Sequence, residues 1–259
     1  MILCLDAGNT RLKWAYGPAG QTLPWVDQGV CGYADLAALP RQALAGDRAE
    51  AVSLIRVANV AGPSIASTIQ SVFTPWADRL TFVQTSVFAG GVNNRYEPPE
   101  TLGVDRWCGL LGAWGLFGQA ALVVSLGTAT TVDALDHTGT FLGGLILPGL
   151  SLMQDSLAQG TAQLPYLPDI GKSESMEGWP IRTAEAIQAG VREATAGAIE
   201  RAWQRLKGEL LKEGMAARLP LCVLSGGAAD SLVPFLQGTP VQASLRIQPG
   251  LVLLGLKSF

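Results

Sequence analysis

The stretch LCLDAGNTRLKW, residues 3–14, decides the fold. An apolar run from Ile2 to Leu5 ends at Asp6, three small or turn-forming residues follow, and an alternating run begins at Arg11. This pattern predicts two antiparallel strands, 2–6 and 11–16, joined by a tight turn. A weaker copy, LVVSLGTATTVDAL at residues 122–135, predicts strands 120–126 and 129–135, and its first strand ends at Ser125 where the first copy has an acid.

Each copy begins a series of further elements. The first continues with a strand near 22–30, a helix at 34–45, a strand at 51–58, a helix at 63–74 and a strand at 80–83. The second continues with a strand at 140–147, a helix from Leu150, a long helix at 183–213, a strand at 220–225 and a helix from Ala228. A meander followed by alternating helices and strands predicts a mixed sheet in each half. We therefore expect a duplicated α/β fold, with domains 1–115 and 116–259 around a central cleft.

The segment between the halves is NNRYEPPETLGVDRWCGLLGAWGLF, residues 93–117. The pair Pro98-Pro99 argues against regular structure at that point. Thr101 or Asp105 is expected to cap a following helix, which then bridges the two domains.

Composition excludes several classes of protein. Hydrophobic residues make up 48% of the 259 and charged residues 15%, as in a globular chain. The net charge is −3 and no basic stripe occurs, so nucleic acid is not an expected partner. The four cysteines are far apart without a CxxC pair, which favours buried thiols in a reducing cytoplasm. The single histidine, His137, stands in the turn-like DHTG, which argues against a histidine-based triad or metal site.

Apolar stretches are too short for a membrane protein. The N-terminal run is broken by Asp6, and the longest stretch, FLGGLILPGLSLM, is interrupted by Gly-Gly and Pro-Gly. A membrane span needs about 20 apolar residues. We expect a cytoplasmic protein with no membrane partner.

Two interpretations fit the turn after Asp6. Exposed amides around Gly8, together with Thr10 and Lys13, can cradle phosphates, with Asp6 reaching them through Mg²⁺. Alternatively the stretch is an ordinary hairpin whose polar residues stabilise the turn. The copy near Ser125 favours the first, because two glycine-hydroxyl corners facing one cleft can hold a polyphosphate.

Three other motifs also leave two interpretations. In GVDR, residues 103–106, Asp105 is a general base and Arg106 binds an acidic substrate, or the two form a helix cap and a surface ion pair. Tyr96 lines the same pocket or is an exposed loop residue. GGLILPG, residues 143–149, either opens a helix whose start favours anions or only forms turns at its glycines and proline. SGG, residues 225–227, accommodates an adenine or forms a tight strand-to-helix turn.

Together these motifs closely resemble the type III pantothenate kinase family, of the actin/Hsp70/sugar-kinase superfamily. The matching segments follow the family order over almost the whole chain: DAGNTRLK (6–13), GVDR (103–106), GTATTVD (127–133), GGLILPG (143–149), RTAEAIQAG (182–190), SGG (225–227) and PGLVLLGL (249–256). The resemblance implies two actin-like, ribonuclease H-like ATPase domains with mixed sheets. It also implies ATP-dependent phosphorylation of pantothenate as the first step toward coenzyme A, with Mg²⁺, a monovalent cation and a homodimer.

The resemblance also assigns residues. The ATP-binding set is Asp6, Ala7, Gly8, Asn9, Thr10, Arg11, Leu12, Lys13 and Thr128. The pantothenate-binding set is Tyr96, Gly103, Val104, Asp105, Arg106 and Thr183, with Asp105 as proton acceptor and the pocket near the subunit interface.

This chain departs from the family at Ser125. Members of the family usually carry an aspartate there, which helps to bind the monovalent cation. A serine hydroxyl predicts weak K⁺ or NH₄⁺ binding or none. Two alternative functions remain, a kinase for another small molecule such as a sugar, and a non-catalytic nucleotide-binding regulator. Arg106 argues against the first, and the presence of Asp6, Lys13 and Asp105 argues against the second.

Overall fold

The computed structural model describes residues 1–20, 24–167, 178–214 and 219–259, and these fold as two compact units. Unit 1 combines Met1–Gly118 with Gly250–Phe259, and unit 2 is Gln119–Pro249. The bounds differ from the expected domains 1–115 and 116–259, because the last ten residues return to unit 1.

The sheet of unit 1 has the strand order β3-β2-β1-β4-β5. Its strands are β1 (Ile2–Ala7), β2 (Leu12–Gly17), β3 (Asp27–Cys31), β4 (Leu54–Asn59) and β5 (Leu80–Phe82). The first three are antiparallel neighbours, whereas β4 is parallel to β1 and to β5. This is the mixed sheet that the sequence predicts, and the expected strands at 2–6, 11–16, 51–58 and 80–83 are confirmed. The third strand begins later than expected, at Asp27, and residues 22 and 23 of the prediction lie outside the described residues.

The helical elements of unit 1 differ from the prediction in detail. They are η1 (Tyr33–Ala38), α1 (Leu39–Ala43), α2 (Arg48–Ala51), α3 (Pro63–Val72), η2 (Thr74–Trp76), η3 (Pro99–Thr101), α4 (Val104–Phe117), α8 (Leu251–Gly255) and η5 (Leu256–Ser258). The expected helix at 34–45 is split, because Pro40 lacks an amide proton and stands in the first turn of α1. Pro99 likewise opens the short η3, so the expectation of no regular structure there is wrong.

The expected caps of α4 are also wrong. The N-cap is Gly103, and no side chain makes a cap hydrogen bond. Thr101 Oγ1 donates to the Pro98 carbonyl at 2.7 Å, and Asp105 Oδ1 accepts from the Arg106 amide at 2.8 Å. Thr101 is used for a local turn before the helix, whereas Asp105 accepts a free amide of the first helical turn from inside that turn, so neither occupies the N-cap position.

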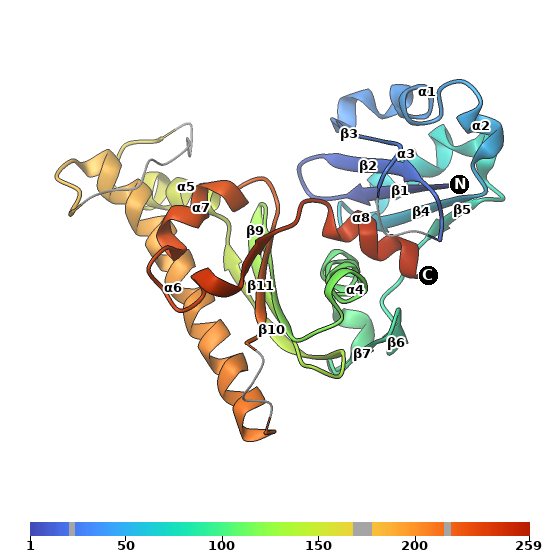
Figure 1. The fold of residues 1–259 in the computed structure, drawn as a ribbon. Coiled ribbons are helices and arrows are strands. Elements are labelled where there is room, and N and C mark those ends of the chain that lie inside the picture. The colour runs from blue at the N-terminus through green and yellow to red at the C-terminus, as the bar shows by residue number, and fades with distance from the viewer. Residues whose placement is uncertain (21–23, 168–177, 215–218) are drawn as a thin grey trace. The chain divides into compact units, whose positions relative to one another are not determined.

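Two glycines bring α4 and α8 into backbone contact. A Cβ atom added at Gly112 would lie closer than 3.0 Å to the Leu251 carbonyl oxygen, and one added at Gly255 equally close to that of Cys108. Figure 1 shows α8, in red, beside α4, in green. This contact, with the bond from Arg56 Nη1 to the Leu256 carbonyl at 3.0 Å, explains why the C-terminal segment belongs to unit 1.

Unit 2 repeats the arrangement of unit 1. Its strands are β8 (Ala121–Leu126), β9 (Ala129–Leu135), β10 (Thr140–Pro148), β11 (Leu221–Ser225) and β12 (Leu245–Ile247), in the order β12-β11-β8-β9-β10. Its helices are α5 (Leu150–Gly160), α6 (Thr183–Lys212), α7 (Ala229–Leu236) and η4 (Gln242–Ser244). The meander β8-β9-β10 is antiparallel, and β11 is parallel to β8 and β12. The predicted strands and helices of this half are confirmed, except that β12 was not expected.

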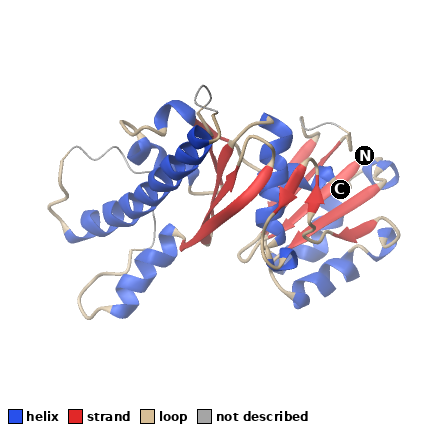
Figure 2. Cartoon of the chain, turned by 90° about the horizontal axis from the view of Figure 1, so that it is seen from below, coloured by secondary structure: helices blue, strands red, loops and turns tan. Residues whose placement is uncertain are grey.

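The long helix α6 covers the sheet of unit 2 (Figure 2). Its buried positions recur every three or four residues, as an amphipathic helix requires: Ala196, Ile199, Trp203, Leu206 and Leu210. Trp203 Nε1 also donates to the Pro220 carbonyl at 2.7 Å, which joins the helix to the start of β11. Unit 1 also contains a small hairpin that was not predicted, formed by β6 (Phe88–Ala89) and β7 (Val92–Asn94). Its strands are too short to show the alternation of apolar and polar residues that marks a strand in the sequence.

Among the residues that the structure describes, no helix combines the length and the apolar character needed to cross a membrane.

Candidate active site

The first strand carries a carboxylate, Asp6, next to its C-terminal residue. Asp6 is a direct cross-strand partner of Lys13, so both side chains project from the same face of the sheet. Cys4 and Ala15 lie on that face and pack with Cys108 of α4. The Asp6 side chain is therefore directed toward the side that α4 covers, and it is 8% exposed.

The environment of Asp6 favours its protonated form. Burial raises the pKa of its carboxyl to about 6, Lys13 acts in the opposite direction, and the charge of Asp105 adds to the rise. Burial also raises the pKa of the Cys108 thiol, and Asp6 and Asp105 raise it further. These effects place Asp6, Asp105 and Cys108 in one neighbourhood of unit 1. They also leave Cys108 a protonated thiol without a nucleophilic role.

The start of α4 presents Asp105 and Arg106. The Asp105 carboxylate folds back toward Gly103, where an added Cβ atom would lie 2.7 Å from its Oδ1. A side chain at position 103 would therefore displace the Asp105 carboxylate from this position. The Arg106 side chain is buried, and its guanidinium carbon lies 5.4 Å from the centroid of the Tyr96 ring. The aromatic face thus holds the charge of Arg106 in place.

Asn94 organises the loop that carries Tyr96, and sequence reasoning did not select it. Its side chain is 6% exposed. It donates to the carbonyls of Ser86 at 3.2 Å and Pro99 at 3.3 Å, and it accepts from the Tyr96 amide at 2.9 Å. The only signal in the sequence was an asparagine shortly before a proline pair, and its burial became visible only in the structure.

A second residue that sequence reasoning missed touches the turn after Asp6. The Tyr33 hydroxyl donates a hydrogen bond to the Gly8 carbonyl across 25 positions of the chain. Burial, with a contribution from Asp6, raises the pKa of Tyr33 to about 12. The turn residues Asn9, Thr10 and Arg11 are exposed, as a loop that receives a ligand should be.

In unit 2, the turn with Thr128 joins β8 to β9 and packs against the start of α5. The Gly149 amide donates to the Thr128 carbonyl at 3.0 Å, and a Cβ at Gly149 would lie closer than 3.0 Å to the carbonyls of Gly127 and Thr128. That amide is therefore not available to an anion. Gly143 and Gly144 do not open a helix but lie inside β10, at a bulge where Gly143 adopts φ +124°. Gly226, after β11, is pressed against the Leu126 carbonyl, as a tight strand-to-helix turn requires.

Ser125 stands in a row of hydroxyls. Its direct partners are Thr131 on β9 and Ser225 on β11. None of the three supplies a negative charge. Asp133 lies two residues beyond Thr131 on the same face of β9, about 7 Å along the strand. The donor set at Ser125 therefore does not match a site built on a carboxylate.

Thr183 is the first residue of α6. It lines a groove of about 480 Å³ between α5 and α6, whose other side chains are mainly apolar, among them Met153, Leu157 and Ile187. The groove lies wholly within unit 2.

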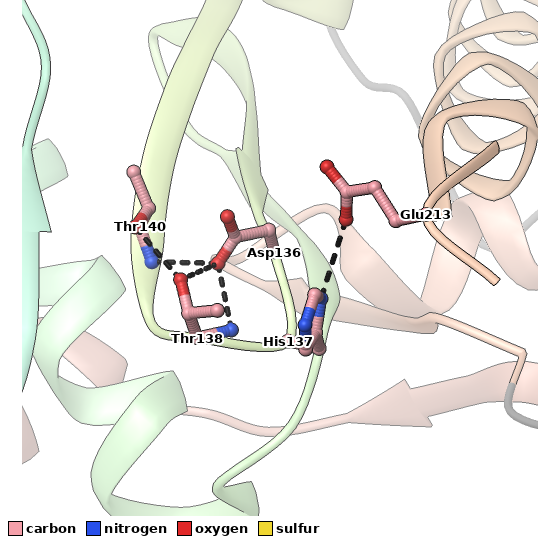
Figure 3. Close-up of polar contacts among 5 residues, drawn as sticks. All are labelled: Asp136, His137, Thr138, Thr140 and Glu213. Carbon is pink, nitrogen blue, oxygen red and sulfur yellow. Dashed lines mark hydrogen bonds and ion pairs between the residues drawn. The ribbon is translucent and has the colours of Figure 1, made fainter. Parts of the chain in front are cut away.

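The single histidine has a structural contact. His137 Nδ1 lies 3.4 Å from Glu213 Oε2, at the end of α6 (Figure 3). The neighbouring Asp136 Oδ1 accepts from the Thr138 amide and hydroxyl and from the Thr140 amide, at 2.7–2.8 Å. This network closes the β9–β10 turn. Within the described ranges, no cluster of three or more histidine, cysteine or acidic side chains suits a metal ion.

The repeated mixed sheets and the glycine turn after β1 define the protein as an α/β protein with the duplicated actin-like ATPase fold. Among solved structures, it resembles a Campylobacter jejuni protein described as a Baf family transcriptional activator, at 16% identity and a TM-score of 0.57 over 98% of this chain and 95% of that one. It also resembles the activator of 2-hydroxyisocaproyl-CoA dehydratase from Clostridium difficile, with ADPNP bound, at 12% identity and a TM-score of 0.51 over 99% and 92%. At such identities these likenesses concern the fold alone.

The sequence comparisons define the family. A profile of the type III pantothenate kinase family matches residues 2–205. Curated type III pantothenate kinases of Dechloromonas aromatica and Nitrosospira multiformis are 44% and 38% identical, over 90% and 99% of this chain and 89% of each relative. The corresponding enzyme of Cupriavidus taiwanensis is 41% identical over 98% of this chain and 95% of its own. The chain belongs to the type III pantothenate kinase family.

Proposed function

We propose that this protein transfers the γ-phosphoryl group of ATP to the terminal hydroxyl of pantothenate, giving 4'-phosphopantothenate, the first step toward coenzyme A. The observation that carries the proposal is the meeting, in unit 1, of the Asp6–Lys13 hairpin with the start of α4. A phosphate-binding turn, a base and a buried guanidinium are thereby combined in one folded unit. The family of the chain supports the same activity.

The turn after Asp6 holds the phosphates. The half-buried Gly8 and the exposed Asn9–Arg11 offer backbone amides, and Lys13 adds a positive charge beside Asp6. Phosphoryl transfer depends mainly on positioning and on neutralising phosphate charge, so this set covers most of what the reaction needs. Thr128, exposed in the β8–β9 turn of unit 2, is the family's second ATP contact.

Asp105 and Arg106 act on pantothenate. Asp105 accepts the proton of the pantothenate hydroxyl while the hydroxyl oxygen forms a bond to the γ-phosphorus. The bond between the γ-phosphorus and the oxygen that bridges it to the β-phosphorus breaks at the same time, which releases ADP. Arg106 binds the pantothenate carboxylate through charge-assisted hydrogen bonds, and Tyr96 keeps the guanidinium plane oriented.

The residues fit a Mg²⁺ ion that accompanies ATP. Asp6 is a buried carboxylate whose protonated form is favoured partly by a second carboxylate, Asp105. Mg²⁺ in such sites is usually bound by one or two carboxylates plus substrate phosphates, and it neutralises phosphate charge when bound. Asp6 would hold it, directly or through water. No such match exists for K⁺ or NH₄⁺ at Ser125.

We also propose a homodimer formed through unit 2. The apolar groove between α5 and α6 and the exposed side chains of Trp179 and Ile181, 93% and 91% accessible, support an interface near Thr183. Sedimentation velocity should give a dimer. Leu157→Asp, in the groove, should produce monomers, whereas Leu211→Asp, exposed at the other end of α6, should not.

The cysteines support a cytoplasmic location. Cys4, Cys31, Cys108 and Cys222 are all free and buried, as in proteins of a reducing compartment.

The activity is tested by coupled ADP release with and without pantothenate. ADP release that requires pantothenate supports the proposal. A panel with sugars in place of pantothenate tests the alternative kinase, and binding of ATP without turnover on any substrate would identify a regulator instead.

A further inference from the structure

The hydrogen bond from Tyr33 to Gly8 restrains the phosphate-binding turn from outside it. Tyr33 begins η1, directly after β3, and its ring packs against the core of unit 1. Its hydroxyl reaches the carbonyl of Gly8, the first residue after β1. The restraint is therefore anchored in the core and acts on the tip of the hairpin.

Peptide geometry converts this bond into an orientation of the turn. In a planar trans peptide the carbonyl and the following amide point in opposite directions. A bond that holds the Gly8 carbonyl toward Tyr33 therefore aims the Asn9 amide away from Tyr33. Without it, glycine leaves the orientation of this peptide poorly determined. The Cα atom of Gly8 is also loosely surrounded, since only the Arg11 carbonyl lies within 4 Å of a Cβ built there, at 3.6 Å.

We propose that Tyr33 is a positioning residue for nucleotide binding, whose hydroxyl holds the Gly8–Asn9 peptide so that the Asn9 amide faces the outer phosphates of ATP. This inference rests on the proposed function, which assigns the turn to the phosphates. The hydroxyl remains a donor throughout the neutral range, because burial and the charge of Asp6 raise the pKa of Tyr33 to about 12.

The test is Tyr33→Phe, which removes the hydroxyl and keeps the ring. The matched control is Tyr16→Phe, which removes the same atom from a tyrosine of β2 whose ring faces Arg48 at 5.4 Å. Loss of one positioning hydrogen bond should raise the KM for ATP by about 3- to 10-fold and leave the KM for pantothenate within about 2-fold. Tyr16→Phe should leave both constants unchanged.

Direct titration separates this inference from the proposed function. In calorimetric titrations, Tyr33→Phe should raise the Kd for ATP and for ADP by about 3- to 10-fold. The Kd for AMP should stay within about 2-fold of wild type, because the turn is assigned to the outer phosphates. This readout does not require turnover, so it stands even if pantothenate is not the substrate. Equal weakening of ATP and AMP, or unchanged ATP affinity with only a lower Tm, would overturn the positioning role.

Discussion

Asp6 on β1 and Lys13 on β2 face each other directly across the first hairpin, on the side of the sheet that packs against α4. The charge of Lys13 does not cancel the rise in the pKa of Asp6 that burial causes. Burial raises the pKa of Asp6 to about 6 against the effect of Lys13, and Asp105 contributes to the rise. The protein thus keeps a carboxylate where its own fold disfavours the charge, which is typical of a functional site.

The first prediction concerns stability against pH. Because the pKa of Asp6 is raised from 3.8 to about 6, its contribution to stability is fully present below 3.8 and is lost as the pH rises through 6. Asp6→Asn should therefore raise the free energy of unfolding by roughly 1–3 kcal/mol at about pH 8, and the gain should shrink toward about pH 4. Urea titration at several pH values measures this.

The same variant should lose activity, since it removes the carboxylate assigned to Mg²⁺. Asp78→Asn, with a side chain that is 77% accessible, is the control and should change neither quantity. A pH-independent effect of Asp6→Asn on stability would contradict the role of the carboxylate charge.

The second prediction concerns Asp105 as general base. Asp105→Asn should keep ATP binding and lower kcat by about 10²–10⁴-fold, or roughly 3–5 kcal/mol of barrier. Coupled ADP-release assays measure kcat, and calorimetry with ATP measures nucleotide binding separately. Glu100→Gln, at an exposed acid of η3, is the control. Turnover close to wild type in the folded Asn variant would assign Asp105 only to its local turn with the Arg106 amide.

The third prediction concerns substrate recognition. Arg106→Ala should raise the KM for pantothenate much more than the KM for ATP, because the contact proposed for Arg106 is to the pantothenate carboxylate. Tyr96→Leu should have a smaller effect in the same direction, since it removes only the face that orients the guanidinium. Arg95→Ala, at the exposed neighbour, serves as control. If Arg106→Ala affected both substrates equally, Arg106 would organise the site as a whole.

The fourth prediction concerns the contact between α4 and α8. Gly255→Ala should destabilise the protein by roughly 2–4 kcal/mol, because the added methyl group meets the Cys108 carbonyl of a helix that cannot withdraw. Gly109→Ala and Gly115→Ala, in α4 with nothing within 4 Å of the added atom, should be neutral or slightly stabilising. Thermal and urea unfolding measure the difference. A harmless Gly255→Ala would show that the two helices separate readily.

The fifth prediction concerns the monovalent cation. Loss of one unit charge at ~4 Å is worth about 4 kcal/mol at an effective dielectric of ~20, before desolvation. With Ser125, Thr131 and Ser225 supplying hydroxyls in place of a carboxylate, wild-type turnover should depend weakly on K⁺ or not at all. Turnover is measured against K⁺, with Na⁺ holding the ionic strength constant. A steep requirement at low K⁺ in wild type would contradict the prediction, and its appearance only in Ser125→Asp would support it.

Local patterns in the sequence were enough to predict several elements of this fold. The hairpin with Asp6 and Lys13 follows from an apolar run, a glycine turn and an alternating run, all within a dozen neighbouring residues. The helix α6 follows from its apolar period, and the ordered motifs identify the family. Each of these signals depends on residues that are close in the chain, so propensity and periodicity suffice to find them.

Contacts between distant segments could be recognised only in the folded protein. The return of α8 to α4 depends on two glycines that are about 140 positions apart, and nothing near Gly255 marks it as a site of backbone contact. Tyr33 gains its role from one hydrogen bond to the distant Gly8 carbonyl, and Asn94 gains its role from three side-chain hydrogen bonds that no recognisable motif announces. The cap of α4 was wrongly predicted, because the sequence cannot show that Thr101 bonds to the Pro98 carbonyl or that Gly103 takes the N-cap position with Asp105 inside the first turn. The packing of the whole unit determines which partner a side chain bonds to, so the local sequence is not enough to predict that partner.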